Sequence, residues 1–416
     1  MCSCPAPSGA DADPSSDGSH GLRRRIGPVL LTLYGIGVMV GAGIYVLIGS
    51  IAGQAGLWAP LVFLGAGLVA APTALVYAEL SVRIPESAGE AAYIRRAWGR
   101  EWLAVVVGLS IATVGTTSAA TVLQGGVGYL QVFLDLPSAY LLVAVGILTT
   151  VVATLGVLES LLVAGLFTVL EVLGLVIIIG VGLGSGEVSS DWSAGLGAFP
   201  LAALGPATLL AFFAFVGFED MVNMAEEVRR PERTMPLSIL LALGITTLLY
   251  GLVALAAVRT VGLAALAESQ RPLALVYETA TGSRPHFLAA ISVVAALNGG
   301  LANIIMAARI LYGLGRRNRR LGWFHQVHAR LRTPHRATWI LGGIVLSLAL
   351  FFPMEGLAGV TAGLLLLVFV GMNLTLIHLR RREPGGDFRI PSWIPWVGFV
   401  AALVALVVSM AGHLGS

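Results

Sequence analysis

Residues 35–45 read GIGVMVGAGIY, and this short stretch decides how the chain folds. It carries glycines at positions 35, 37, 41 and 43, inside a run that is otherwise apolar enough to cross a membrane. A glycine in a helix interior costs roughly 0.5–1 kcal/mol relative to alanine. We predict that this spanning helix is broken near its middle. The freed N–H and C=O groups cannot face lipid, so they are buried in protein or line a cavity.

A second stretch supports the same interpretation. Residues 212–220 read FFAFVGFED, where Gly217 interrupts an apolar run and two carboxylates follow it. Glycines that only allow close helix packing, as in GxxxG pairs, would explain the first stretch equally well. Carboxylates inside a membrane, however, are costly and usually functional. The two stretches together therefore favour two broken helices that form a binding site.

The composition indicates that the chain lies in a membrane. Its 416 residues are 57% hydrophobic and 11% charged, and the mean hydropathy is +0.88. A water-soluble fold needs charged faces between its apolar stripes, and these are missing. Apolar runs of about 20 residues mark spanning helices. Eleven are predicted, at 28–52, 58–80, 102–133, 139–158, 160–184, 201–225, 236–262, 286–314, 338–353, 357–379 and 393–412.

The order of the spans relates the two breaks to each other. The first break lies in span one and the second in span six, so equivalent points are five spans apart. Because five is odd, two five-helix units would have opposite orientations in the bilayer. Inverted repeats with broken first helices that meet at the midplane form the binding site of many secondary transporters.

The basic residues predict the orientation. All 25 are arginines, and 21 of them fall in cytoplasmic segments if the N-terminus is cytoplasmic. We therefore expect a multi-pass protein of a prokaryotic plasma (inner) membrane, with the C-terminus outside. Residues 1–25, rich in Pro, Ser, Gly and Asp, are expected to be a disordered cytoplasmic tail. Cys2 and Cys4 in this tail are too few to suggest a metal site.

Four motifs resemble those of amino acid permeases of the amino acid–polyamine–organocation (APC) superfamily. They are GIGVMVGAGIY, FFAFVGFED continuing into NMAEEVRRPERTMP (223–236), RILYGLGR (309–316) with its basic loop, and FRIPSWIPW (388–396). The likeness runs from about residue 26 to residue 412, in order and spacing. It implies an all-α polytopic five-plus-five inverted-repeat (LeuT-like) fold with discontinuous helices 1 and 6. The expected units are 26–185 and 200–380, with an additional spanning helix in 388–416.

The resemblance also implies a function and a site. The function is amino acid transport by alternating access, by symport or exchange. The expected substrate carboxylate ligands are backbone N–H groups of Gly41, Ala42 and Gly43. The expected amine ligands are carbonyls of Ala214, Phe215 and Val216. Phe213 matches a position where an aromatic ring covers the substrate, and Asn303 matches a substrate-facing position or forms an interhelical hydrogen bond. Apart from the resemblance, Phe218 and Thr117 are further pocket candidates. The small polar residues of span three suit a pocket wall or close helix packing: Thr113, Thr116, Thr117, Ser118 and Gln124. Most relatives have twelve spans rather than eleven, so dimerisation through a final helix pair is in doubt.

Charged residues within the spans are candidates for coupling and gating. Glu219 matches an acidic position linked to proton coupling in some relatives, and Glu171 lies far from either end of its span. Each is interpreted as a proton carrier or as a structural hydrogen-bonding group. Glu79 and Arg309, near cytoplasmic ends, either extend to the membrane surface or join Glu226 or Glu227 in an inner gate.

The energy source and the substrate are less constrained. Residues 293–308 of span eight contain no Ser or Thr for a sodium site, so proton coupling or exchange is favoured over sodium. No P-loop, HExxH or GxSxG motif is present, which argues against an ATP-driven pump and an intramembrane enzyme. Neutral or broad amino acid specificity is favoured, with a polyamine exchanger or a transport-inactive amino acid sensor as alternatives. No cofactor, metal or nucleic-acid partner is expected, and the oligomeric state stays open.

Overall fold

The chain folds almost entirely into helices. A computed structural model describes residues 26–86, 89–155, 161–197, 201–317, 319–326, 333–386 and 388–414, so the predicted tail of residues 1–25 lies outside it. Within these ranges no strand occurs, and the β pairing is a single bridge between Ile26 and Val228. The all-α prediction is confirmed.

Many of the helices are suited to a membrane. Among the described residues, seven helices are long and apolar enough to cross one. One of these seven runs from Gly43 to Arg83 and contains parts of two predicted spans. Shorter apolar helices are Pro28–Val40, His335–Phe351 and Ile394–Ser409. The chain is therefore a multi-pass integral membrane protein, while the count of eleven spans stays a prediction.

The first predicted span is interrupted at Gly41. Helix α1 (Pro28–Val40) begins with proline at its first turn, where the missing N–H costs nothing. It ends at Gly41, which also precedes α2 (Ala42–Ala55). A short 3-10 turn, η1 (Gly56–Trp58), then leads into α3 (Ala59–Arg83). The predicted break of helix 1 is confirmed.

The sixth predicted span is interrupted as well. Helix α9 (Leu201–Phe213) ends at the second stretch, and residues 214–218 form turns before the 3-10 helix η2 (Glu219–Glu227). Peptide groups in this segment bond three residues back, as Phe215 N donates to Phe212 O at 2.9 Å. The segment after η2 is attached to the start of the chain, because Ile26 N donates to Glu227 O at 3.0 Å. The predicted break of helix 6 is also confirmed.

The remaining helices surround these two. In chain order they are α4 (Gly89–Trp98), α5 (Glu101–Leu130), α6 (Ser138–Leu155), α7 (Leu161–Gly184), α8 (Ser190–Ala194), α10 (Pro231–Thr260), α11 (Leu263–Glu268), α12 (Pro272–Thr281), α13 (His286–Arg317), η3 (Arg319–His325), α14 (His335–Phe351), α15 (Met354–Arg382) and α16 (Ile394–Leu414). Several of the short ones, α4, α8, α11 and α12, lie in segments that the sequence assigned to loops.

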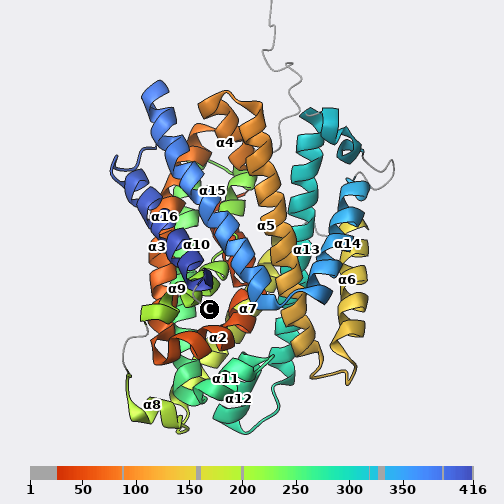
Figure 1. The fold of residues 1–416 in the computed structure, drawn as a ribbon, viewed down its shortest axis with the longest axis vertical. Coiled ribbons are helices and arrows are strands. Elements are labelled where there is room, and N and C mark those ends of the chain that lie inside the picture. Colours follow the sequence, from red (N-terminus) through yellow and green to blue (C-terminus); the bar gives the residue numbers. More distant parts are fainter. Residues whose placement is uncertain are drawn as a thin grey trace, which may run out of the picture.

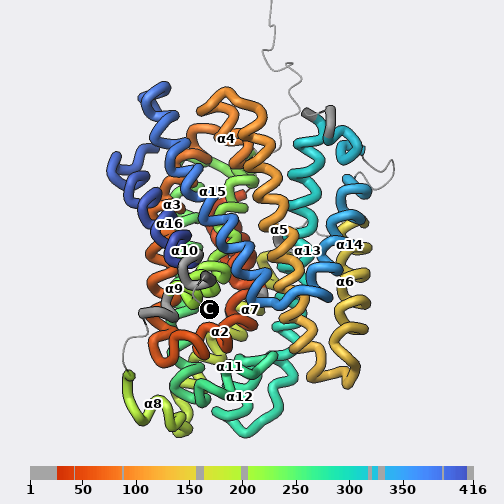
Figure 2. Tube along the Cα trace, in the orientation of Figure 1, coloured from red at the N-terminus to blue at the C-terminus, as the bar shows by residue number. Residues whose placement is uncertain are grey.

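The broken helices lie inside the bundle. Figure 1 shows α5 and α13 side by side, and α6 and α14 paired at one edge of the molecule. The short helix α4 closes one end of the bundle, while α8, α11 and α12 lie at the other end. Along the trace, α2 and α9 come together near the middle of the bundle (Figure 2). This arrangement brings the two breaks together.

Candidate functional site

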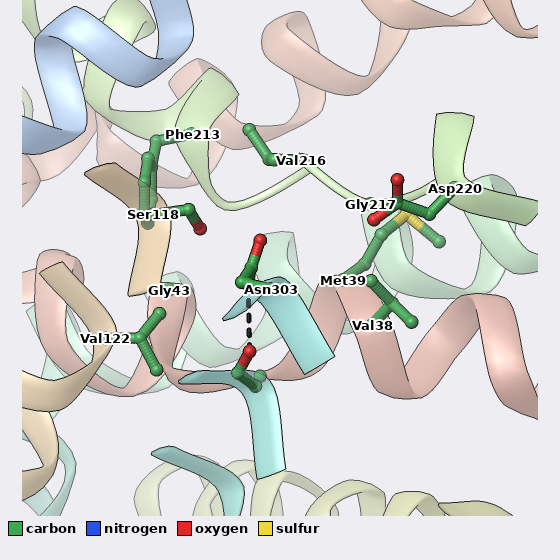
Figure 3. Close-up of a pocket in the computed structure, with 12 residues that line it drawn as sticks. Val38, Met39, Gly43, Ser118, Val122, Phe213, Val216, Gly217, Asp220 and Asn303 are labelled. Carbon is green, nitrogen blue, oxygen red and sulfur yellow. Dashed lines mark hydrogen bonds between the residues drawn. The ribbon is translucent and has the colours of Figure 1, made fainter. Parts of the chain in front are cut away.

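A small cavity lies between the two breaks, and residues of α1, α2, α5, α9, η2 and α13 line it (Figure 3). Its volume is about 20 Å³, which is room for about one water molecule. The lining residues are Val38, Met39, Gly41 and Gly43 from the first break, Phe213, Val216, Gly217 and Asp220 from the second, and Ser118, Val122, Gly299 and Asn303 from the flanking helices. The cavity is thus built mainly from the two interrupted helices.

The first break presents the start of α2 to the cavity. Gly41 caps α2 without any side-chain hydrogen bond, so the first N–H groups of this helix have no intrahelical partner. Such an N-terminus also carries a partial positive charge that favours an anion. A Cβ atom on Gly43 would lie 3.0 Å from the Ala214 Cα atom. The absence of a side chain at Gly43 therefore lets the two breaks touch.

The second break contributes both backbone and side chains. Phe213 and Val216 line the cavity, whereas Ala214 and Phe215 face Tyr250 on α10: the ring centroids of Phe215 and Tyr250 are 5.1 Å apart. Gly217 has φ of 127°, which L side chains rarely adopt. A Cβ on Gly217 would also lie 2.5 Å from Val38 Cγ1. Only glycine fits at this turn.

Tyr250 joins the two breaks. Its hydroxyl lies 2.6 Å from the Met39 carbonyl oxygen in α1 and 2.9 Å from the Ala214 carbonyl oxygen. The side chain is fully buried, so these carbonyls have little access to water. A phenol carries one proton, which the two acceptors must share. Tyr250 is therefore a hydrogen-bonding bridge between the ends of both broken helices.

We expect Tyr250→Phe to lower the free energy of unfolding by about 1–3 kcal/mol, because two buried carbonyls lose their donor while the ring packing is retained. Thermal or denaturant unfolding of the purified protein measures this change. Tyr140→Phe is the matched control, since Tyr140 is 71% exposed. Equal stability of the two variants would show that the bridge contributes nothing.

The opposite wall consists of α5 and α13. Asn303 lines the cavity, and its amide donates to the Gly299 carbonyl at 2.9 Å (Figure 3). The structure places Ser118, not its neighbour Thr117, at the cavity. The Thr117 hydroxyl is instead 2.6 Å from that of Thr361 on α15. Phe218 also lies elsewhere, with its ring packed against Tyr77 and Phe369.

The two carboxylates after the second break face different surroundings. Asp220 lines the cavity, while Glu219 accepts a hydrogen bond from Gly217 N at 3.0 Å. Glu219 thus stabilises the turn that contains the left-handed glycine. Nearby, Glu90 on α4 is 5% exposed, and its burial is the main cause that raises its pKa to about 7. The backbone of Glu90 and the Tyr77 hydroxyl lower this pKa, but by less than burial raises it.

Comparison with known proteins identifies the family. The profile of the amino acid permease family matches residues 26–414. The chain belongs to the amino acid permease family. The resemblance inferred from the four motifs is therefore confirmed, and the function is that of a transporter.

The relatives of this permease have names that refer to different substrates. It is 29% identical to a vacuolar cationic amino acid transporter of Arabidopsis thaliana, over 89% of this chain and 66% of the plant protein. It is 28% identical to a branched-chain amino acid permease of Bacillus subtilis, over 94% of this chain and 89% of the relative. It is also 28% identical to a methylthioribose transporter of Bacillus subtilis, over 93% and 88% respectively.

Glu171 of the permease is buried in α7 with an exposed fraction of 1%. Neither of its carboxyl oxygens makes a hydrogen bond of normal geometry to a described residue. The Asn298 side chain on α13 lies close enough to interact with the carboxyl group. The Glu171 backbone carbonyl accepts a hydrogen bond from the Tyr45 hydroxyl of α2 at 2.7 Å. This places Glu171 beside the first broken helix.

Glu79 is fully buried in an ion cluster at the end of the bundle near α4. Its carboxylate pairs with Arg83 at 2.8 Å and with Arg380 of α15, whose Nε lies 2.9 Å away. Ile390 N donates to the same carboxylate at 2.9 Å. Among the ion pairs of the described residues, Glu79 is thus joined to these two arginines and not to Arg309. The inner gate, in which Glu79 and Arg309 would join Glu226 or Glu227, stays a prediction.

Sequence reasoning missed several parts of this site. Asp220 was noted but not assigned to the cavity, because adjacent residues in a turn point in different directions. Ser118 was one of several small polar residues of span three with nothing to distinguish it. Tyr250 lies in an ordinary apolar run, and no local signal marks its contact with both breaks. Ala42 was predicted as a backbone ligand, and its side chain lies outside the description.

Proposed function

We propose that the permease carries amino acids across the plasma membrane by alternating access, with its N-terminus in the cytoplasm. The substrate carboxylate binds the N–H groups of Ala42 and Gly43 at the start of α2. Gly41 N was expected as a third ligand, but it donates to the Gly37 carbonyl at 3.2 Å and closes the last turn of α1. The amine binds carbonyl groups of the second break around Val216, with Phe213 over the substrate. These groups carry the partial charges that a zwitterion requires.

The main support for this proposal is that the two breaks lie at one cavity. Both breaks line the same cavity, so the free N–H groups of one helix and the irregular backbone of the other face a common space. Lone glycines for helix packing would not produce such an arrangement. Asp220 and Asn303 add side-chain acceptors and donors at the edge of this space.

The small volume of the cavity supports a transporter that changes conformation. A cavity of about 20 Å³ holds about one water molecule and is too small for any amino acid. The breaks or Phe213 must therefore shift before a substrate enters. Short irregular segments that absorb backbone rotation are typical hinges of such motions. The contact between Ile26 and Glu227 would have to loosen if α1 moves away from η2.

Direct binding tests the proposal. We expect amino acids to raise the melting temperature of the purified permease, and radiolabelled amino acid to accumulate in proteoliposomes. The panel includes the twenty amino acids, polyamines and methylthioribose, because one relative is named for the last. Stabilisation by polyamines or methylthioribose alone would overturn the carboxylate role of α2. Binding without uptake or exchange would indicate a sensor.

We propose that Glu171 carries the proton that couples transport to the gradient. Glu171→Gln keeps the size of the side chain but cannot titrate. We expect uptake by this variant to become independent of the pH gradient, whereas exchange of amino acid between the two sides continues. Uptake in proteoliposomes with and without an imposed gradient measures this.

Glu187→Gln is the control for Glu171→Gln, because Glu187 is exposed in the loop after α7. It should retain the gradient dependence of the unmodified permease. If Glu171→Gln also retains it, Glu171 has a structural role, and Glu219→Gln becomes the next variant for the same assay.

A further inference from the structure

A second, much larger cavity opens on the outer surface of the bundle, away from the two breaks. Its volume is about 600 Å³, within the range of roughly 300–1,000 Å³ typical of small-molecule sites. Helices α3, α8 and α10 and the turn η1 form its walls. The lining residues are Leu57, Trp58, Pro60, Leu61, Leu64, Trp192, Gly195, Leu196, Leu248, Gly251, Leu252 and Leu255. We call this cavity the outer groove.

The outer groove faces lipid. Its rim residues Leu61 and Leu248 are 53% and 60% exposed, and they lie on two helices that are suited to cross a membrane. Its floor is a close contact between these helices, since a Cβ on Gly251 would lie 2.9 Å from Leu64 Cδ2. The groove is therefore open toward the bilayer and closed toward the protein interior.

The wall made by α8 is held in place. Ser189 N donates to the Arg259 carbonyl at 2.8 Å, and the Ser189 hydroxyl donates to the Val258 carbonyl at 3.1 Å. The Asp191 carboxylate accepts a hydrogen bond from Leu263 N at 2.8 Å. These contacts attach α8 to the end of α10 and to the start of α11. The groove is thus preformed rather than a gap left by a loose segment.

The side chains that line the outer groove favour an amphipathic ligand. Its side chains are aliphatic apart from Trp58 and Trp192, so a polar ligand would lose its hydration without gaining hydrogen bonds. Tryptophan is enriched at the level of the lipid headgroups. The two tryptophans come from η1 and α8, at the helix ends, while Leu248 and Leu252 lie further along α10. A ligand with a polar head near the tryptophans and an alkyl tail along the leucines fits this pattern.

We propose that the outer groove binds an acyl chain of a membrane phospholipid. The bound chain contacts α10 at Leu248 and Gly251, on either side of Tyr250. Tyr250 bridges the two breaks, so the lipid also supports the helix that holds the candidate site together. The binding itself does not depend on the proposed transport function, and the test below measures binding alone.

Photolabelling tests the proposal. The full-length protein is reconstituted in vesicles of phosphatidylethanolamine and phosphatidylglycerol, with a trace of phosphatidylcholine that carries a diazirine in one acyl chain. After illumination, mass spectrometry maps the labelled peptides. We expect label to concentrate in residues 57–64, 192–196 and 248–255. We expect Leu248→Trp, which fills the rim, to reduce this label by about tenfold, equivalent to about 1.4 kcal/mol.

Leu241→Trp is the matched control. Leu241 lies on the same helix, about two turns away, and is 43% exposed outside the groove. It should leave labelling of the groove unchanged. Label spread evenly over the exposed apolar helices, or equal labelling of Leu248→Trp and the unmodified protein, would overturn the proposal. So would a crosslink between two copies of the chain at these residues, since the occupant would then be protein.

Discussion

Gly43→Val is expected to abolish amino acid uptake while the protein is still made and inserted. At this position even a Cβ atom would come within 3.0 Å of the Ala214 Cα atom, and that neighbour is backbone. The two extra methyl groups of valine would separate the breaks and cover the N–H groups at the start of α2. We therefore expect uptake in proteoliposomes to fall to the level of empty vesicles.

The control for this variant is Gly180→Val. Gly180 is an exposed helical glycine in α7, and a Cβ there would meet nothing within 4 Å. It introduces the same β-branched residue without touching the cavity, so its uptake should be normal. If Gly43→Val is poorly produced, Gly43→Ala makes a smaller intrusion and should weaken substrate-dependent thermal stabilisation. Normal uptake by Gly43→Val would refute close approach of the substrate to this backbone.

Glu79→Ala is expected to lower the free energy of unfolding by about 3–5 kcal/mol, because it leaves two buried arginines without a counter-ion. Glu79 is fully buried, and the side chains of Arg83 and Arg380 are only 6% and 8% exposed. Removal of the carboxylate also leaves Ile390 N without its acceptor. The cluster joins α3 to α15 and to the segment before α16, so its loss should loosen this end of the bundle.

An exposed ion pair provides the comparison. Arg96 and Glu383 are 3.0 Å apart, with side chains 61% and 47% exposed. Such surface pairs contribute about 0–1 kcal/mol. Glu383→Ala should therefore change the denaturant midpoint little, whereas Glu79→Ala should shift it strongly. Similar midpoints for both variants would mean that Glu79 is not the counter-ion that stabilises this cluster.

Local chemistry was sufficient to predict the two breaks. Glycines at 41, 43 and 217 weaken their helices wherever the chain folds, and apolar runs on both sides require the freed peptide groups to be inside the protein. The helical class and the family followed from the same residues. The short helices α4, α8, α11 and α12 were missed, because brief amphipathic segments between spans carry weak periodicity.

The sequence by itself determined where the backbone is interrupted, because helix propensity and membrane solvation act on a few neighbouring residues. Tertiary structure alone decided which side chains meet at the interruption. Tyr250 bonds carbonyls 211 and 36 residues away, and Glu79 reaches Arg380 across 301 residues. Such partners depend on how whole helices rotate and cross, and that depends on packing summed over the entire bundle. Packing likewise joined Glu79 to Arg83 and Arg380, two partners that the sequence did not name.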